Sequence, residues 1–171
     1  MKTYIVTGGL GFIGHHLCKR LLEDGHRVYS VDNKTNKEYN EKNERKLLQY
    51  DTFRNIDEDI RYINHTPIVG EVDGLFHLAA TPRVQLSFDH PEETNSVNIN
   101  GTLAVLEWAR ENKIPRVVFA SSSTAKTKMS PYGIQKATCE DYMNLYNEYM
   151  GVNTVCLRYH SVYGPNMDSS G

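Results

Sequence analysis

Cysteine is scarce in this sequence. Only three occur among 171 residues, at Cys18, Cys139 and Cys156. An odd number at wide spacing provides neither a closed set of disulfides nor a zinc-ligand spacing. Thiols of this kind are typical of a reducing compartment. We therefore expect a cytoplasmic protein whose cysteines serve as small buried apolar side chains.

The sequence also lacks an excess of basic charge and any long apolar run. Its 19 basic and 21 acidic residues give a net charge of −2, whereas a protein that follows a nucleic-acid backbone needs a basic excess. No apolar run approaches the roughly 18 residues of a membrane helix. We expect neither a nucleic-acid partner nor a membrane partner.

Histidines in metal-ligand spacing are absent as well. The seven histidines are scattered, and the adjacent His15 and His16 would project from different sides of a helix. The sequence therefore predicts no metal site.

Short β-rich runs alternate with segments of helical periodicity along the chain. We expect strands at Tyr4–Thr7, Arg27–Val31, Ile60–Asn64, Val72–Ala80, Arg116–Ala120 and Thr154–Arg158. We expect helices at Gly11–Glu23, from Pro91 to near Lys113, and at Pro131–Met150. This alternation predicts an α/β fold, a doubly wound parallel sheet of about six strands in one domain covering residues 1–171.

One stretch interrupts this pattern. Residues 33–59 are rich in Asn, Lys and Glu and show little periodicity, apart from a helical turn or two at Arg45–Tyr50. We expect a long polar excursion there, part helix and part mobile loop.

A glycine-rich turn follows the first expected strand. Gly8, Gly11 and Gly14 are spaced so that the first permits a tight exit from the strand, the second admits a pyrophosphate, and the third lets the helix pack closely. Asp32 ends the next strand, where an acid accepts hydrogen bonds from ribose hydroxyls and repels a 2′-phosphate. The spacing therefore predicts NAD rather than NADP as the cofactor.

A second constellation lies later in the chain. Tyr132 and Lys136 stand at i and i+4 on one helix face, after the Ser121–Thr124 run that ends a strand. A neighbouring ammonium and an oxidised nicotinamide favour the phenolate, so the tyrosine could act as a general base. A surface pair and a capping serine run remain the simpler alternatives.

These residues resemble a known family, the extended short-chain dehydrogenase/reductases, and among them the NAD-dependent nucleotide-sugar epimerases and dehydratases, which have a Rossmann fold. The resemblance extends over Thr7–Gly14, Asp32–Asn33, His77–Ala80, Asn98–Thr102, Tyr132–Lys136 and Arg158–Pro165.

The resemblance implies roles residue by residue. The implied catalytic residues are Tyr132, Lys136 and Ser122, with Ser123 as the substitute if the register slips by one. The implied NAD-binding residues are Gly8, Gly11, Phe12, Ile13, Gly14, Asp32, Asn33, Ala79, Ala80, Asn98, Tyr132 and Lys136. The acid that contacts adenine has no clear counterpart, since Asp59, Asn64 and His65 all compete.

Some positions depart from the family pattern. Only nine residues separate Ser122 from Tyr132, and Ser161 stands where the family has a substrate-contacting Asn. The sequence ends at Gly171, before the C-terminal lobe that holds the nucleotide-diphosphate sugar in such enzymes, so we expect a cofactor lobe only.

The resemblance implies NAD-dependent epimerisation of a nucleotide-diphosphate sugar through a transient keto-sugar. Dehydratases carry an Asp-Glu pair where Ser123-Thr124 stands, so epimerisation is favoured over a dehydratase or reductase. A non-catalytic NAD-binding module, a sensor or assembly subunit, remains the alternative from another class. The resemblance also implies a possible homodimer through the helices around 92–112 and 131–150.

Overall fold

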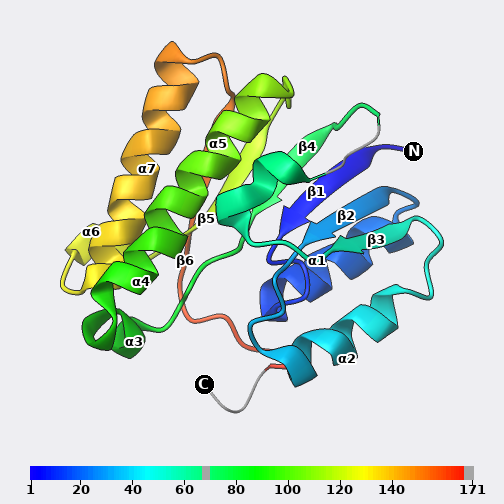
Figure 1. Cartoon of the computed structure of the whole chain (residues 1–171), viewed down its shortest axis with the longest axis horizontal. Helices are drawn as coiled ribbons and strands as arrows, with labels where there is room; N and C mark the ends of the chain where they lie inside the picture. The colour runs from blue at the N-terminus through cyan, green and yellow to red at the C-terminus, as the bar shows by residue number, and fades with distance from the viewer. Residues whose placement is uncertain (67–69, 168–171) are drawn as a thin grey trace.

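Six parallel strands form one sheet at the centre of the molecule (Figure 1). The computed structural model describes residues 1–66 and 70–167. In chain order the strands are β1 (Thr3–Thr7), β2 (Arg27–Val31), β3 (Phe53–Ile56), β4 (Gly74–His77), β5 (Val117–Ser122) and β6 (Thr154–Tyr159). Their spatial order, β3-β2-β1-β4-β5-β6, is the doubly wound order of a Rossmann sheet. The predicted fold class is confirmed.

Alternating side chains of each strand enter two separate cores. Ile5 packs with Val31 and Leu75 in the core on one face, whereas its neighbour Val6 packs with Val28 in the core on the other. Buried on both faces, such strands are apolar almost throughout. The sheet is therefore covered on both sides, which leaves the ends of its strands as the place for a site.

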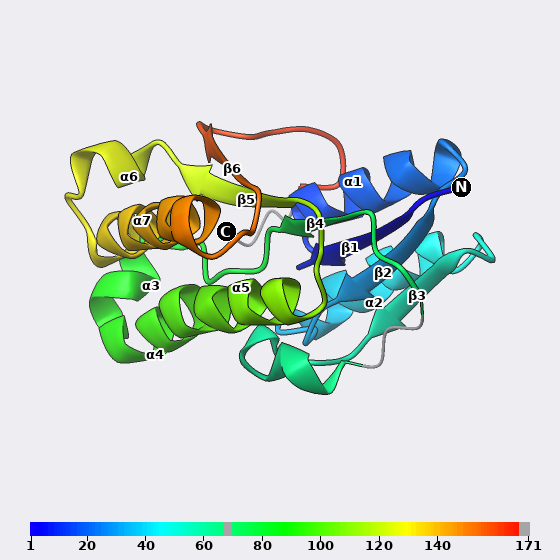
Figure 2. The ribbon, with the colours of Figure 1, turned by 90° about the horizontal axis from the view of Figure 1, so that it is seen from above.

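Helices cover both faces of the sheet. They are α1 (Phe12–Glu23), α2 (Lys37–Leu47), α3 (Val84–Asp89), α4 (Pro91–Asn95), α5 (Gly101–Glu111), α6 (Thr124–Thr127) and α7 (Pro131–Tyr149). Figure 2 shows α1 and α5 on opposite sides of the sheet.

None of the helices within residues 1–66 and 70–167 has the length and apolar character needed to cross a membrane.

The predicted third strand was wrong. Residues Ile60–His65 form a 3₁₀ helix, and the strand beside β2 is Phe53–Ile56 instead. The Asp59 side chain caps this helix by accepting from the Arg61 amide. Ile60 and Ile63, three residues apart, both point into the core. This spacing suits a 3₁₀ turn and not the two-residue repeat of a strand.

The polar excursion is more ordered than expected. It contains a helix of three turns, α2, where we predicted only a turn or two at Arg45–Tyr50, and it ends in β3. The helix buries two amides, Asn40 and Asn43, besides Leu47. Asn43 donates from its amide to the Leu10 carbonyl oxygen at 2.9 Å. Because these buried residues are polar, the hydrophobic periodicity did not reveal the helix.

The helix expected from Pro91 onward is interrupted. A π-helical turn, Ser96–Asn100, joins α4 to α5. Such turns often occur at functional sites, and this one carries Asn98. The short helices α3 and α6 were not predicted. They lie in the segments that follow the carboxyl ends of β4 and β5.

Candidate functional site

The glycine turn joins β1 to α1 with no room for side chains at two of its positions. Gly8 has φ +69°, and a Cβ there would lie 2.8 Å from the amide nitrogen of Ala79. A Cβ on Gly14 would lie 2.1 Å from the carbonyl oxygen of Gly8. Main-chain atoms cannot yield as a flexible side chain does, so both positions require glycine.

The helix that follows this turn begins without a side-chain cap. Gly11 is its N-cap residue and has no side chain to offer. The first amides of a helix have no partner within it. The amides of Phe12 and Ile13, at the positive end of the helix dipole, are therefore placed to donate to an anion such as a diphosphate.

Asp32 lies beside this turn, at the carboxyl end of β2. Its carboxylate accepts from the Leu10 amide at 3.0 Å and from the Lys34 amide at 2.9 Å, and the residue is only 8% exposed. Burial raises the pKa of Asp32, while the two amides hold that pKa down. The structure thus fixes the orientation of this carboxylate from the main chain.

Of the three candidates for contacting adenine, Asp59 is joined to the residue that follows Asp32. The Asn33 side-chain amide donates to Asp59 at 3.2 Å. Arg61 also donates to Asp59 and lowers the pKa of that carboxyl. Asn64 and His65 are exposed on the 3₁₀ helix instead.

A chain of hydrogen bonds that sequence reasoning missed joins the glycine turn to the middle of the sheet. The buried His77 ring lies 2.7 Å from the Thr7 hydroxyl through Nδ1 and 3.0 Å from the Thr102 hydroxyl through Nε2. Thr102 donates its own proton to the Asn98 carbonyl oxygen. Nε2 must therefore carry the imidazole proton, and Nδ1 accepts from Thr7. Burial lowers the pKa of His77 to about 3, which keeps the ring neutral.

Asn98 holds the segment after β4 in place. Its side-chain oxygen accepts from the Thr81 amide at 2.7 Å, and its side-chain nitrogen donates to Gln135 at 2.7 Å. Ala79, next to this segment, donates from its amide to Thr7 at 3.3 Å. Asn98 therefore supports the Ala79-Ala80 strand end, and Gln135 is a partner that the sequence motifs did not indicate.

Ser122 and Tyr132 meet where β5 ends. A hydrogen bond with the Ser122 hydroxyl holds down the pKa of Tyr132, but burial outweighs it and raises that pKa to about 12. The Ser122 hydroxyl also lies 2.9 Å from the Thr124 hydroxyl. Helix α6 lies within the segment between Ser122 and Tyr132 and packs against α7. This short segment therefore brings the serine to the tyrosine.

The Lys136 ammonium lies over the Tyr132 ring, 5.8 Å from the centre of that ring. The ammonium also donates to the Ala120 carbonyl oxygen at 2.7 Å and lies 4.5 Å from the centre of the Phe119 ring. Burial lowers the pKa of Lys136 to about 8. In the chain alone, burial dominates at Tyr132 and raises its pKa. The lower tyrosine pKa expected beside an oxidised nicotinamide stays a prediction.

The neighbouring serine has a different role. Ser121 donates to Glu140, which also pairs with Arg158 at the end of β6. That cluster ties α7 to β5 and β6. Successive residues of a strand face opposite sides, so Ser122 is the serine that meets Tyr132, and Ser121 serves the packing of the sheet.

Similarity to known proteins identifies the family of this chain. The profile of the family described as "NAD dependent epimerase/dehydratase family" matches residues 4–171. The chain belongs to this family.

The described part of the chain holds no group of three or more His, Cys, Asp or Glu that could bind a metal ion.

Relatives of the epimerase/dehydratase family match nearly the whole chain. The UDP-glucose 4-epimerase of Mycolicibacterium smegmatis is 31% identical over 100% of this chain and 59% of that protein. The solved UDP-N-acetylglucosamine 4-epimerase of Methanobrevibacter ruminantium, in complex with UDP-N-acetylmuramic acid, is 32% identical with a TM-score of 0.84, over 99% of this chain and 58% of that one.

A third similar protein was solved with a cofactor. The UDP-glucuronic acid 4-epimerase of Bacillus cereus, in complex with UDP-glucuronic acid and NAD, has a TM-score of 0.85 and 28% identity over 96% of this chain and 58% of that one. The chain therefore spans less than two thirds of the length of these family members.

Proposed function

We propose that the protein catalyses NAD-dependent epimerisation of a nucleotide-diphosphate sugar through a transient keto-sugar, and that residues 1–171 supply its cofactor-binding and catalytic part. The observation that carries the proposal is the meeting of Tyr132 and Ser122 at the carboxyl end of β5, with Lys136 one helical turn away. Ligands of doubly wound sheets bind at this edge.

The residues of the turn fit NAD. Its diphosphate would be held by the uncapped amides of Phe12 and Ile13, and Gly11, which has no side chain, would let the diphosphate approach the main chain. Asp32 would accept from the hydroxyls of the adenosine ribose, and Asp59, which accepts a hydrogen bond from Asn33, would contact adenine. When bound, NAD accepts a hydride from the sugar and later returns it.

The protein's own part is to move a proton and to hold the sugar oxygen. Tyr132 would take the proton of the sugar hydroxyl as the carbonyl forms and give it back as the carbonyl is reduced. Ser122 would donate a hydrogen bond to the same oxygen. The positive nicotinamide ring favours the phenolate, which offsets the burial that raises the pKa of Tyr132 to about 12 in the chain alone.

The relatives support a UDP-sugar as the substrate, since those described above are named for UDP-sugars. The Ser123-Thr124 pair after Ser122 offers no carboxylate for an elimination. This supports epimerisation over dehydration.

The proposal includes a cytoplasmic location and a homodimer. All three cysteines are free thiols, which suits a reducing compartment. The α7 helix presents exposed apolar side chains at Ile134, Leu145 and Tyr149, which suits a packing face shared with α5. Sedimentation of the purified protein as a monomer at micromolar concentration would exclude the dimer.

The function is tested with the full-length protein, NAD and a panel of UDP-sugars, with epimers separated by chromatography. Tyr132→Phe removes only the phenolic hydroxyl, so we expect NAD binding to survive and epimer formation to fall at least about a hundredfold. Tyr62→Phe is the matched control, because Tyr62 is 53% exposed and lies outside the proposed dimer face. Equal turnover in the two variants would refute the role of Tyr132.

A further inference from the structure

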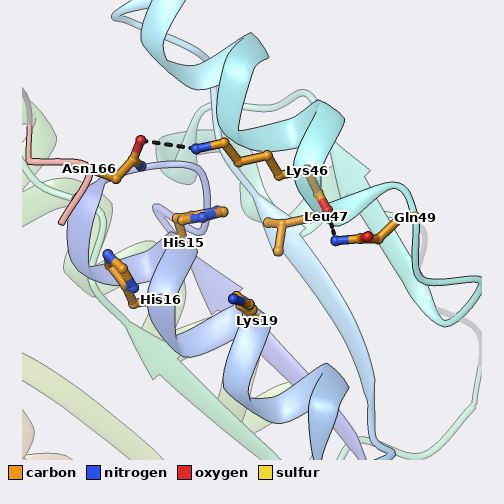
Figure 3. A pocket seen from close by; sticks show the side chains of 7 residues that line it. All are labelled: His15, His16, Lys19, Lys46, Leu47, Gln49 and Asn166. Carbon is orange, nitrogen blue, oxygen red and sulfur yellow. Dashed lines mark hydrogen bonds between the residues drawn. The ribbon is translucent and has the colours of Figure 1, made fainter.

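A basic cavity lies outside the proposed catalytic site, between α1, α2 and the segment that follows β6. Its volume is about 330 Å³. Figure 3 shows the side chains that surround it. The lining residues are His15, His16, Lys19, Lys46, Leu47, Gln49 and Asn166. None of them is among the residues assigned above to NAD or to catalysis.

The lining has cationic and amide groups but no carboxylate. Lys19 extends from α1 and Lys46 from the last turn of α2, so two separate helices supply the lysines. Lys19 has an exposed partner, Glu23, at 3.6 Å, whereas no carboxylate lies within ion-pair distance of Lys46 among residues 1–66 and 70–167. A surface cavity with this charge favours an anion.

A buried imidazole in the lining is not satisfied. His15 is 4% exposed, and its Nδ1 has no hydrogen-bond partner in the described part of the chain. Burial, with His16, Lys46 and Lys19 close by, lowers the pKa of His15 to about 4. Buried polar atoms are nearly always paired, so this ring is an unusual element of the cavity wall. Its three basic neighbours leave positive charge that an anion in the cavity would balance.

The segment that follows β6 forms one wall of the cavity and is joined to α1 and α2 by hydrogen bonds. The Lys46 ammonium donates to the Asn166 side-chain oxygen at 3.1 Å, and the Asn166 side-chain nitrogen donates to Asn43 at 2.8 Å. The His16 Nε2–H donates to the Pro165 carbonyl oxygen at 2.8 Å. Figure 1 shows this segment crossing from β6 to α2. The site is therefore formed before any ligand arrives.

We propose that this cavity binds a small doubly charged oxyanion, namely phosphate, either free or as a small phosphate monoester. Lys46 has two ammonium protons left after its bond to Asn166, and Lys19 reaches from the opposite helix. Hydrogen bonds between cations and a phosphate oxygen are short and strong. The cavity is formed by the second and third turns of α1, whereas the diphosphate of NAD is assigned to the amides that begin this helix.

The binding is tested by thermal unfolding and calorimetry of the full-length protein, with inorganic phosphate and glycerol phosphate as probes and chloride at matched ionic strength as the reference. Phosphate should raise the unfolding temperature above that in chloride. Lys46→Gln should weaken phosphate binding by about tenfold or more, because it removes a charge-assisted hydrogen bond. Lys42→Gln, the same change at an exposed residue one turn earlier on α2 that does not line the cavity, should leave the affinity unchanged within twofold.

Two outcomes distinguish the source of the phosphate group. Binding of both probes supports a monoester ligand, and binding of inorganic phosphate alone supports the free ion. No response beyond that to chloride would overturn the proposal. A response that persists in the Lys19→Gln/Lys46→Gln double variant would also overturn it, since the anion would then be bound elsewhere, for example at the glycine turn.

A second measurement reads the cavity directly. Saturating phosphate should raise the pKa of His15, seen in the nuclear magnetic resonance of its imidazole protons, from about 4 toward the ordinary 6.5. An unchanged His15 titration in the phosphate-bound protein would place the anion outside the cavity.

Discussion

The ammonium of Lys136 lies 2.7 Å from the main-chain carbonyl oxygen of Ala120. The lysine is thereby fixed to β5, directly below the serine that meets Tyr132. Burial disfavours the charged form of Lys136, because only 3% of the residue is exposed to water. This one bond holds the cation beside the Phe119 ring of β5, 4.5 Å from the centre of that ring.

Lys136 should make stability depend on alkaline pH. Its folded pKa is about 8, below the ordinary 10.5, so between these values the unfolded chain binds more protons and stability rises with pH. The rise attributable to Lys136 is at most about 1.4 kcal/mol per pH unit. We expect Lys136→Met to remove it from urea unfolding curves between pH 8 and pH 10.

The control for this experiment is Lys126→Met, since Lys126 is exposed on α6. It should leave the slope unchanged. Burial also raises the pKa of Tyr132, Cys18 and Cys156. These groups lower stability at alkaline pH in the wild type and in Lys136→Met alike, so the difference between the two slopes reports on Lys136. Equal slopes in the wild type and Lys136→Met would show that the lysine is not desolvated.

Gly14 and Gly11 should respond differently to the same substitution. Gly14→Ala places Cβ 2.1 Å from the Gly8 carbonyl oxygen, so we expect a loss of about 3 kcal/mol or more in the free energy of unfolding. Gly11→Ala meets nothing closer than 3.3 Å and should cost less than about 1 kcal/mol. It should nevertheless weaken NAD binding. Chemical denaturation and calorimetry measure both effects.

Asp32 should determine the choice of cofactor. We expect the wild-type protein to bind NAD more tightly than NADP, and Asp32→Ala to narrow the preference by about tenfold, because the change removes charge-assisted hydrogen bonds and a repulsion. Asp51→Ala, at an exposed position, is the control. Equal affinity of the unmutated protein for both cofactors, measured by calorimetry, would contradict the role of Asp32.

Much of the sheet could be predicted because its strands are short apolar runs between turn residues. The third strand could not, since Phe53 is the only buried residue of Phe53–Ile56, whereas Ile60–Asn64 has the composition of a strand. The α2 helix was hidden because amides of Asn40 and Asn43 occupy its buried face. Local composition does not reveal a polar group that packs inward to reach a distant main-chain atom.

The candidate site divides in the same way. Gly8, Gly14 and Asp32 follow from local spacing, because each role depends on a turn or a strand end. The His77 network does not, since its bonds join residues 70 and 25 positions apart. Such contacts exist only once the sheet order brings β1, β4 and α5 together.

His77 should make the protein sensitive to acid. Its folded pKa of about 3 lies below the ordinary 6.5, so between these values the unfolded chain binds more protons and stability falls as the pH falls. We expect His77→Gln to cost about 1–3 kcal/mol at pH 7 through lost hydrogen bonds. Its unfolding curves should approach those of the wild type near pH 4, because the imidazole penalty is absent from the variant.

The control is His90→Gln, because His90 is exposed. This variant should leave unchanged the dependence of the free energy of unfolding on pH between pH 7 and pH 4. A constant difference between wild type and His77→Gln from pH 7 to pH 4 would mean that the ring is not held neutral.

Residues 1–171 alone should bind NAD without converting a UDP-sugar. The glycine turn, Asp32 and the Tyr132 cluster lie within them, but they match only 58% or 59% of the similar epimerases described above. Turnover needs the sugar carbon held against the nicotinamide, and binding energy from remote parts of a substrate provides that placement. We expect calorimetry to show NAD binding and chromatography to show no epimer from UDP-glucose, UDP-galactose or UDP-glucuronic acid. Multiple turnovers by these residues would show that they bind the sugar by themselves.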